Sequence, residues 1–177
     1  MHRGLFLDRD GILNLSHVRN GRPYAPRSIE EFVLYEDLAA TLFCLSNHNV
    51  KIIVVTNQPD ISTGLQTIQG VDEMHAFMRN SFPIDAIIVC PHTAEDQCSC
   101  RKPSPGMLIS SAKEWNINLS ESVMVGDRWR DIDAGKAVGC YTIFVDHGYK
   151  EKQPVGMDAV ASTPLDALKE AQSVLLA

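Results

Sequence analysis

The sequence predicts an α/β fold, with a doubly wound, mainly parallel sheet that is covered by helices on both faces. Two observations predict it. Short apolar runs rich in β-branched residues recur along the 177 residues, and the segments between them carry apolar residues at helical spacing. Because strands that alternate with helices form parallel sheets, we expect a three-layer, Rossmann-like arrangement. The length suits one domain, which we assign to residues 1–177.

The apolar runs predict buried strands, in chain order, at residues 4–7, 51–56, 86–90, 122–126 and 141–145. Helices are expected between the strands, where apolar side chains recur with helical periodicity: Leu38, Leu42 and Leu45; Met74, Phe77 and Met78; Met107, Leu108 and Ala112; Ile132 and Ala137. No internal repeat or low-complexity tract marks a linker or a second domain.

Charge and composition argue against several classes of protein. The formal net charge of −6 disfavours a surface for nucleic acid or anionic membrane, because such partners are held by a basic face. The first apolar run is broken by Asp8, so it matches neither a signal peptide nor a membrane anchor. We therefore expect a cytoplasmic protein without nucleic-acid or membrane partners, and a monomer is the default for a chain of this size.

Polar residues follow each of the first four predicted strands. In parallel sheets of this kind, ligands bind beyond the carboxyl ends of the strands, where the strand order reverses. The residues that reach this edge include carboxylates, a hydroxyl and a lysine, in the segments 8–11, 56–58, 90–102 and 126–131. Their convergence on one edge predicts the functional site.

The carboxylates at this edge favour a metal ion. Asp8 and Asp10 lie two positions apart, so in an extended chain both side chains would point the same way. Two carboxylates about 4 Å apart repel by roughly 4 kcal/mol at an effective dielectric constant of about 20, so they need a cation. Asp127 adds another oxygen ligand, and such a shell suits Mg²⁺. Asp131 either joins the shell or serves only a helix start, where acids are favoured.

These residues together predict hydrolysis of a phosphate ester. With Mg²⁺ to screen its charge, Asp8 becomes a plausible nucleophile towards phosphorus. Thr56 would donate a hydrogen bond to the phosphoryl oxygens, and Lys102 would neutralise charge on the transferring group. Asp10 would protonate the leaving alkoxide and, once an aspartyl-phosphate has formed, take a proton from the attacking water.

Four motifs carry a family resemblance. The strings LFLDRDG, VVTNQ and VGDRWRD, together with Lys102, resemble the motifs of the haloacid dehalogenase-like hydrolases, from residue 4 to about residue 145. The resemblance implies that Asp8 is the nucleophile, that Asp10 is the acid and base, and that Mg²⁺ is held by Asp8, the backbone carbonyl of Asp10 and Asp127. The second aspartate marks the phosphatases of the family. The spacing of the motifs leaves no room for the inserted cap domain that many members carry.

A cluster of cysteines predicts a second metal. Three of the five cysteines gather with a histidine in one short segment, at Cys90, His92, Cys98 and Cys100. In a reducing compartment thiols remain available to metals, and this set fills a tetrahedral Zn²⁺ site with no position left for water. We predict a structural zinc loop at residues 90–102, although the thiols could also be incidental. Because Arg101 and Lys102 leave the loop directly, the metal would fix their positions.

The pattern CPH…CxCRKPxPGM resembles one capless, zinc-containing branch of the family, which contains heptose bisphosphate 7-phosphatases and histidinol-phosphate phosphatases. Residues 105–107 favour the heptose enzymes, whereas the short gap between His92 and Cys98 favours the histidinol enzymes. The resemblance to the heptose enzymes implies that the sugar-phosphate substrate contacts four residues: Asn57, Arg101, Lys102 and Arg128.

Two features depart from this branch. Ile12 stands where threonine is usual, and Pro59-Asp60-Ile61 replaces a turn of small residues. The negative charge of Asp60 would repel a second phosphate unless nearby arginines offset it: Arg101, Arg128 and Arg130. A phosphate-binding adaptor without catalysis is a further alternative. The intact set of acids argues against an adaptor, because a pure binding module has no use for an unneutralised acid beside a phosphate.

Overall fold

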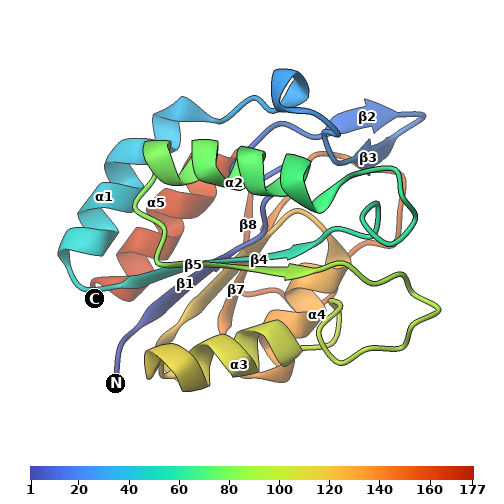
Figure 1. The fold of residues 1–177 in the computed structure, drawn as a ribbon. Helices are drawn as coiled ribbons and strands as arrows, with labels where there is room; N and C mark the ends of the chain where they lie inside the picture. Colours follow the sequence, from blue (N-terminus) through green and yellow to red (C-terminus); the bar gives the residue numbers. More distant parts are fainter.

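The computed structural model describes residues 1–177 and contains a six-stranded sheet with the strand order β5-β4-β1-β6-β7-β8 (Figure 1). Every pair of neighbouring strands in it is parallel, as the alternation of strands and helices predicted. The chain adds β4 and β5 on one side of β1 and then returns to add β6, β7 and β8 on the other. The strand order therefore reverses between β1 and β6, which is where such sheets bind ligands.

The sheet consists of β1 (Gly4–Leu7), β4 (Lys51–Asn57), β5 (Ala86–Cys90), β6 (Val123–Gly126), β7 (Tyr141–Val145) and β8 (Ala159–Ala161). The helices are α1 (Ala39–Asn47), α2 (Ile68–Ser81), α3 (Gly106–Trp115), α4 (Trp129–Ala137) and α5 (Pro164–Leu175), and a 3₁₀ turn, η3, covers Leu119–Glu121. The predicted strands and the first four helices are confirmed, with strand ends that agree to about one residue. No helix combines the length and the apolar character that a membrane-spanning segment needs.

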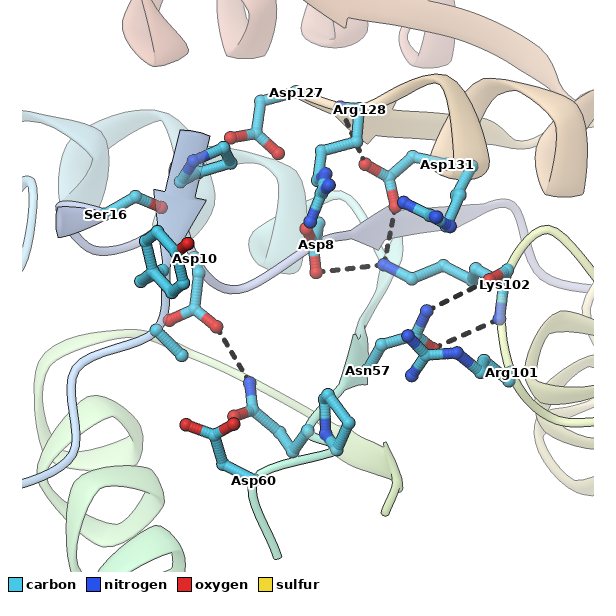
Figure 2. Close-up of a pocket in the computed structure, with 16 residues that line it drawn as sticks. Asp8, Asp10, Ser16, Asn57, Asp60, Arg101, Lys102, Asp127, Arg128 and Asp131 are labelled. Carbon is cyan, nitrogen blue, oxygen red and sulfur yellow. Dashed lines mark hydrogen bonds and ion pairs between the residues drawn. The ribbon is translucent and has the colours of Figure 1, made fainter. Parts of the chain in front are cut away.

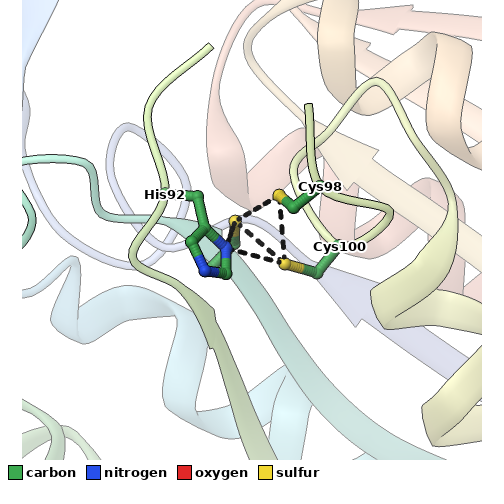
Figure 3. A group of neighbouring side chains, drawn as sticks. His92, Cys98 and Cys100 are labelled. Atoms are coloured by element: carbon green, nitrogen blue, oxygen red, sulfur yellow. Dashed lines mark hydrogen bonds between the residues drawn. The ribbon is translucent and has the colours of Figure 1, made fainter. Parts of the chain in front are cut away.

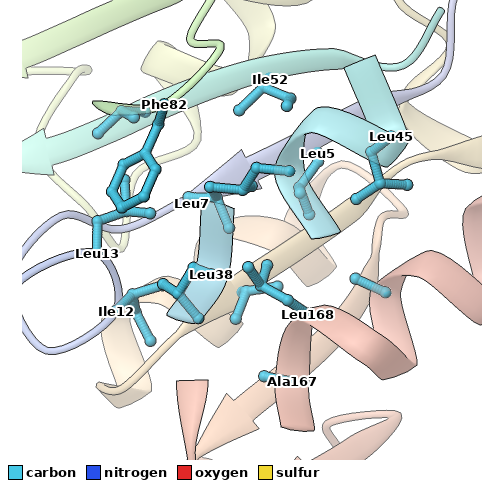
Figure 4. Packing of buried hydrophobic residues seen from close by; sticks show 14 of the residues in the cluster. Leu5, Leu7, Ile12, Leu13, Leu38, Leu45, Ile52, Phe82, Ala167 and Leu168 are labelled. Carbon is cyan, nitrogen blue, oxygen red and sulfur yellow. The ribbon is translucent and has the colours of Figure 1, made fainter. Parts of the chain in front are cut away.

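Alternate residues of each central strand enter opposite cores. Leu5 and Leu7 of β1 belong to a core of 23 buried residues that includes side chains of α1, α2 and α5 (Figure 4). Phe6 faces the other way, into a core of 11 residues that includes side chains of α3 and α4. This period of two is what an extended chain imposes. The sheet is therefore the middle of three layers, as predicted.

A β-hairpin lies between β1 and α1, and it was not predicted. It pairs β2 (His17–Arg19) with β3 (Arg22–Tyr24) in antiparallel fashion. Its turn has positive φ at Asn20 (54°) and Gly21 (80°), which is the type I′ geometry that suits a two-residue hairpin. Apart from this hairpin, only the 3₁₀ turns η1 (Ile29–Glu31) and η2 (Glu36–Leu38) lie between β1 and α1, so no cap domain is inserted there.

The tip of the hairpin is held by the coil that follows β7. The backbone N–H of Lys150 donates to the carbonyl of Gly21 at 2.8 Å. A Cβ atom at Gly21 would lie 2.7 Å from the Lys150 side chain, so the contact leaves no room for a larger residue. The hairpin is thus fixed beside the carboxyl ends of the strands.

Strand β8 and helix α5 extend the predicted pattern at the carboxyl-terminal side. Helix α5 begins with a sequence signal that the periodicity analysis did not use: Thr163 accepts a hydrogen bond from the backbone N–H of Asp166, and Pro164 occupies the first turn. Its Leu168 and Ala171 are fully buried in the larger core. This helix completes the cover of one face of the sheet.

Candidate active site

A cavity of about 250 Å³ opens at the carboxyl ends of the strands, next to the reversal in strand order (Figure 2). Four segments predicted to meet at this edge contribute to its lining, and the hairpin adds Pro23 and Tyr24. Its charged lining residues are five aspartates and four cations: Asp8, Asp10, Asp60, Asp127 and Asp131, with Arg101, Lys102, Arg128 and Arg130. The lining is strongly polar, which suits a charged ligand.

Three carboxylates converge at the base of the cavity. Oxygen atoms of Asp8, Asp127 and Asp131 lie within 4.8 Å of one another, and all three residues are buried. Burial, followed by the charges of Asp8 and Asp131, raises the pKa of Asp127 well above its ordinary value. Both carboxylate oxygens of Asp127 are buried without a hydrogen-bond partner. A buried carboxylate of this kind is costly unless a cation accompanies it, so the donor set fits Mg²⁺.

Gly11 leaves space for this cluster. A Cβ atom at Gly11 would lie 1.9 Å from Oδ2 of Asp127, and the backbone φ of Gly11 is +84°. Both facts require glycine at this position. The carbonyl of Gly11 also accepts a hydrogen bond of 2.8 Å from Nε2 of His147. Because a carbonyl can only accept, that nitrogen carries the proton, and His147 supports the loop after β1.

Lys102 is the counter-charge of the cluster. Its Nζ lies 2.9 Å from Asp8 Oδ1 and 2.6 Å from Asp131 Oδ1, and it donates to the carbonyl of Val55 at 2.7 Å. These contacts use all three N–H groups of the ammonium, which is 2% exposed. Burial alone would lower the pKa of Lys102, but the carboxylates of Asp131 and Asp8 raise it above its ordinary value. Lys102 therefore stays charged and holds Asp8 in place.

Asp131 serves the fold and the site together, which the sequence had left open. Its Oδ2 accepts a hydrogen bond of 3.0 Å from the backbone N–H of Arg128 and caps the start of α4. Its Oδ1 binds Lys102. With both oxygens engaged, Asp131 orients Lys102 and rigidly links α4 to the cluster.

The carboxylate of Asp10 is held apart from this cluster, which differs from the extended-chain expectation. Strand β1 ends at Leu7, so the period of two does not continue to Asp10. Arg9 Nη2 donates to both oxygens of Asp10 at 2.9 and 3.0 Å. Gln58 Nε2 donates at 2.8 Å and Asn14 Nδ2 at 3.0 Å. Asp10 thus faces the cavity as a separate carboxylate with a fixed position, which suits proton transfer.

Arg9 is a functional residue that sequence reasoning missed. Its side chain is fully buried, and its guanidinium lies 5.4 Å from the ring centroid of Phe32. Its Nη1 is 3.2 Å from Nε2 of His75. Burial, and then the charge of Arg9, lowers the pKa of His75 to about 4, so the neutral ring accepts from Arg9. This buried frame fixes the guanidinium that binds Asp10.

The residues at the carboxyl end of β4 connect the two halves of the site. Thr56 is 1% exposed, does not line the cavity, and accepts a hydrogen bond of 2.8 Å from Gln58 Nε2. Its own O–H therefore remains able to donate. Asn57 closes a paired contact with the backbone of Lys102: its Nδ2 donates to the carbonyl at 3.0 Å, and its Oδ1 accepts from the N–H at 3.1 Å. Asn57 thereby fixes Lys102 as well as lining the cavity.

The outer cations of the cavity are held by specific partners. Arg101 Nη1 donates to the carbonyl of His92 at 2.8 Å. Arg128 forms an ion pair with Glu151, in which Nε lies 2.9 Å from Oε1. Asp60, expected to repel a second phosphate, is paired with Arg27 at 2.7 Å. This pairing offsets part of its negative charge.

The predicted zinc ligands form one compact cluster (Figure 3). The sulfur atoms of Cys90, Cys98 and Cys100 are 3.2 to 3.6 Å apart, and Nδ1 of His92 lies 3.3 Å from the sulfur of Cys100 and 3.6 Å from that of Cys90. A tetrahedral zinc with metal–sulfur bonds of about 2.3 Å has sulfur–sulfur edges of about 3.8 Å, so the donor set fits Zn²⁺. The backbone N–H of Arg101 points to the Cys98 sulfur at 3.4 Å. The cluster and the outer cations are therefore directly connected.

A family model described as HAD-hydrolase-like matches residues 99–171. A D-glycero-β-D-manno-heptose-1,7-bisphosphate 7-phosphatase of Helicobacter pylori is 32% identical over 140 residues, which cover 76% of this chain and 78% of that protein. An enzyme of the same name from Vibrio cholerae is 32% identical over 186 residues, which cover 97% of this chain and 95% of that protein.

Two further comparisons complete these findings. The histidine biosynthesis bifunctional protein HisB of Blochmanniella floridana is 34% identical over 140 residues, which cover 76% of this chain but only 38% of that protein. Among solved structures, the D,D-heptose 1,7-bisphosphate phosphatase of B. bronchiseptica, complexed with magnesium and phosphate, superposes with a TM-score of 0.80 at 25% identity. That match covers 95% of this chain and 97% of the other.

Proposed function

The chain belongs to the haloacid dehalogenase-like hydrolases, and from this membership we propose that it is a Mg²⁺-dependent phosphatase that removes the 7-phosphate of D-glycero-D-manno-heptose 1,7-bisphosphate. One observation carries the proposal. Lys102 and three buried carboxylates converge where the strand order reverses, and a fourth carboxylate, that of Asp10, is held separately. We also propose that the protein works as a single-domain monomer in the cytoplasm, where thiols stay reduced and can bind zinc.

Each residue then has a chemical role. Asp8 and Asp127, with the backbone carbonyl of Asp10, would hold Mg²⁺, which when bound neutralises the charge between Asp8 and the phosphate. An oxygen of Asp8 attacks phosphorus, and Lys102 stabilises the negative charge of the transferring group. Asp10 donates a proton to the leaving sugar oxygen and later takes one from the water that hydrolyses the aspartyl-phosphate. Arg9 and Gln58 keep the Asp10 carboxylate in reach of both steps.

The charge of the outer cavity favours a bisphosphate over histidinol phosphate. The non-transferred part of histidinol phosphate carries an amine and an imidazole, whereas that of the heptose bisphosphate carries a phosphate. Three guanidinium groups line the outer cavity, those of Arg101, Arg128 and Arg130. Like charges repel an ammonium there, and a phosphate is attracted.

The substrate test compares phosphate release from the two esters in the presence of Mg²⁺. We expect kcat/KM to be at least about 100-fold higher for the heptose bisphosphate, because contacts with charged partners are worth roughly 1.5 to 3 kcal/mol each. A higher kcat/KM for histidinol phosphate would reject the heptose assignment. A protein that binds phosphate but releases none from any ester would instead be an adaptor.

We further propose that Cys90, His92, Cys98 and Cys100 bind one structural Zn²⁺, which acts by positioning Arg101 and Lys102. Cys98→Ser should reduce the zinc content measured by atomic spectroscopy and lower kcat/KM by about 10- to 100-fold, since the loop that presents both cations loses its anchor. Cys44→Ser is the matched control, because Cys44 lies outside the cluster and should leave zinc and activity unchanged. Full activity in a zinc-free Cys98→Ser protein would contradict this role.

A further inference from the structure

The outer wall of the cavity carries more positive charge than its neighbours neutralise. Arg101, Arg128 and Arg130 all line the cavity. Arg128 is paired with Glu151, and Arg101 donates to a carbonyl, which carries no net charge. Arg130 has no hydrogen-bond or ion-pair partner in the structure, although it is half-buried. The wall therefore keeps surplus positive charge that faces the cavity.

The two carboxylates that follow Arg130 most closely in the sequence, those of Asp131 and Asp133, are engaged elsewhere. Asp131 binds Lys102 and the backbone of Arg128. Asp133 lies 3.5 Å from Nζ of Lys152. Burial, and then the charge of Arg128, lowers the pKa of Arg130, as expected for a cation placed among like charges. Neither of these carboxylates therefore forms an ion pair with Arg130.

Trp129 holds the guanidinium of Arg130 in position. The guanidinium carbon lies 4.6 Å from the centroid of the Trp129 ring, and Nζ of Lys152 lies 3.9 Å from the same centroid. Stacking on an aromatic ring uses the flat face of a guanidinium and leaves its N–H edges free. Those edges match two oxygens of a phosphate in a bidentate contact. Arg130 is therefore prearranged to bind an anion in the cavity.

We infer that Arg130, stacked on Trp129, binds the second, non-transferred phosphate of the substrate and makes the enzyme prefer a bisphosphate to the corresponding monophosphate. This inference rests on the proposed function, since it names a specificity residue for the same cavity. The site is separate from the transferring group, which Asp8 and Lys102 serve at the base of the cavity. Arg130 accordingly affects binding of the bisphosphate and leaves the chemical step unchanged.

The test compares the heptose 1,7-bisphosphate with the same sugar carrying only the 7-phosphate. In Arg130→Met, we expect kcat/KM for the bisphosphate to fall by about 10- to 100-fold, mainly through KM, because one charged contact is lost. The kcat/KM for the monophosphate should stay within about twofold of wild type, since it lacks the group that Arg130 binds. Arg130→Lys should lose less than Arg130→Met, because lysine keeps the positive charge but lacks the planar guanidinium that makes a bidentate contact.

Arg79→Met is the matched control. Arg79 is exposed in the last turn of α2, so this variant removes the same charge away from the cavity and should leave both substrates unaffected. Thermal unfolding of each variant verifies that it is folded. Unchanged kinetics in folded Arg130→Met, or an equal loss on both substrates, would overturn the inference and leave the proposed function standing. A wild-type protein inactive on the bisphosphate would overturn both.

Discussion

Asp8→Asn should abolish phosphate release while the protein remains folded. We expect kcat to fall by at least about 10,000-fold, because an amide cannot attack phosphorus and the aspartyl-phosphate cannot form. The change is isosteric and removes one of three carboxylates that lie within 4.8 Å of one another. Relief of that repulsion should raise the melting temperature in metal-free buffer. Phosphate-release kinetics and thermal unfolding with and without Mg²⁺ measure both effects.

Asp72→Asn provides the control for Asp8→Asn. Asp72 is exposed on α2 and lies outside the cavity, so this variant changes the net charge equally without touching the site. It should keep wild-type kinetics and the wild-type response of the melting temperature to Mg²⁺. Turnover of Asp8→Asn above about one hundredth of wild type would show that Asp8 is not the nucleophile.

Lys102→Met should damage stability and catalysis together. Asp8 and Asp131 would lose the only cation that contacts them both, and breaking a buried pair of this kind costs about 3 to 5 kcal/mol. We expect the free energy of unfolding, measured by urea denaturation, to fall by about that amount in metal-free buffer and to recover partly with Mg²⁺. The kcat/KM should fall by about 1,000-fold, because the transferring group loses a preorganised positive charge.

Lys113→Met is the control for this variant, since Lys113 is exposed on α3 and contributes nothing to the cavity. If Lys102→Met kept more than about a tenth of the wild-type kcat/KM, Lys102 would be a structural residue and not part of the reaction.

The sequence predicted the sheet and the position of the site because both follow from local patterns. A buried strand is a short apolar run, and parallel strands bring the residues after them to one edge. The proposed zinc ligands could be predicted for the same reason. All four lie in one loop, and their spacing is visible without knowledge of the rest of the fold. The fold class is confirmed by the strand order and by the match to solved relatives.

Contacts between distant segments could not be predicted in this way. The ion pair of Arg128 with Glu151 and that of Arg27 with Asp60 join loops whose relative positions depend on packing. Arg9 lies inside a recognised motif, but its burial against Phe32 depends on how the segment that ends η1 packs against the loop after β1. No periodicity or spacing in one sequence encodes such contacts.

The position of Asp10 illustrates a limit of the periodicity argument. The prediction that Asp8 and Asp10 point to one ligand assumed an extended chain, whereas β1 ends at Leu7 and the backbone turns at Gly11. The hairpin β2–β3 was missed for a related reason, because its strands are too short to show alternation. Its Asn-Gly turn was nevertheless a usable signal.

The coil after β7 contacts three different segments beside the cavity within a few residues. His147 binds the Gly11 carbonyl, Lys150 binds the hairpin at Gly21, and Glu151 binds Arg128. Surface coils usually tolerate insertions and sequence variation. This coil should tolerate them poorly, because its three contacts fix the number of residues between them. An added or deleted residue here would shift the loop after β1, the hairpin and Arg128 together, and so would change catalysis, entry of the substrate and its binding. Mutations meant to change the substrate specificity should therefore be made in other segments that line the cavity.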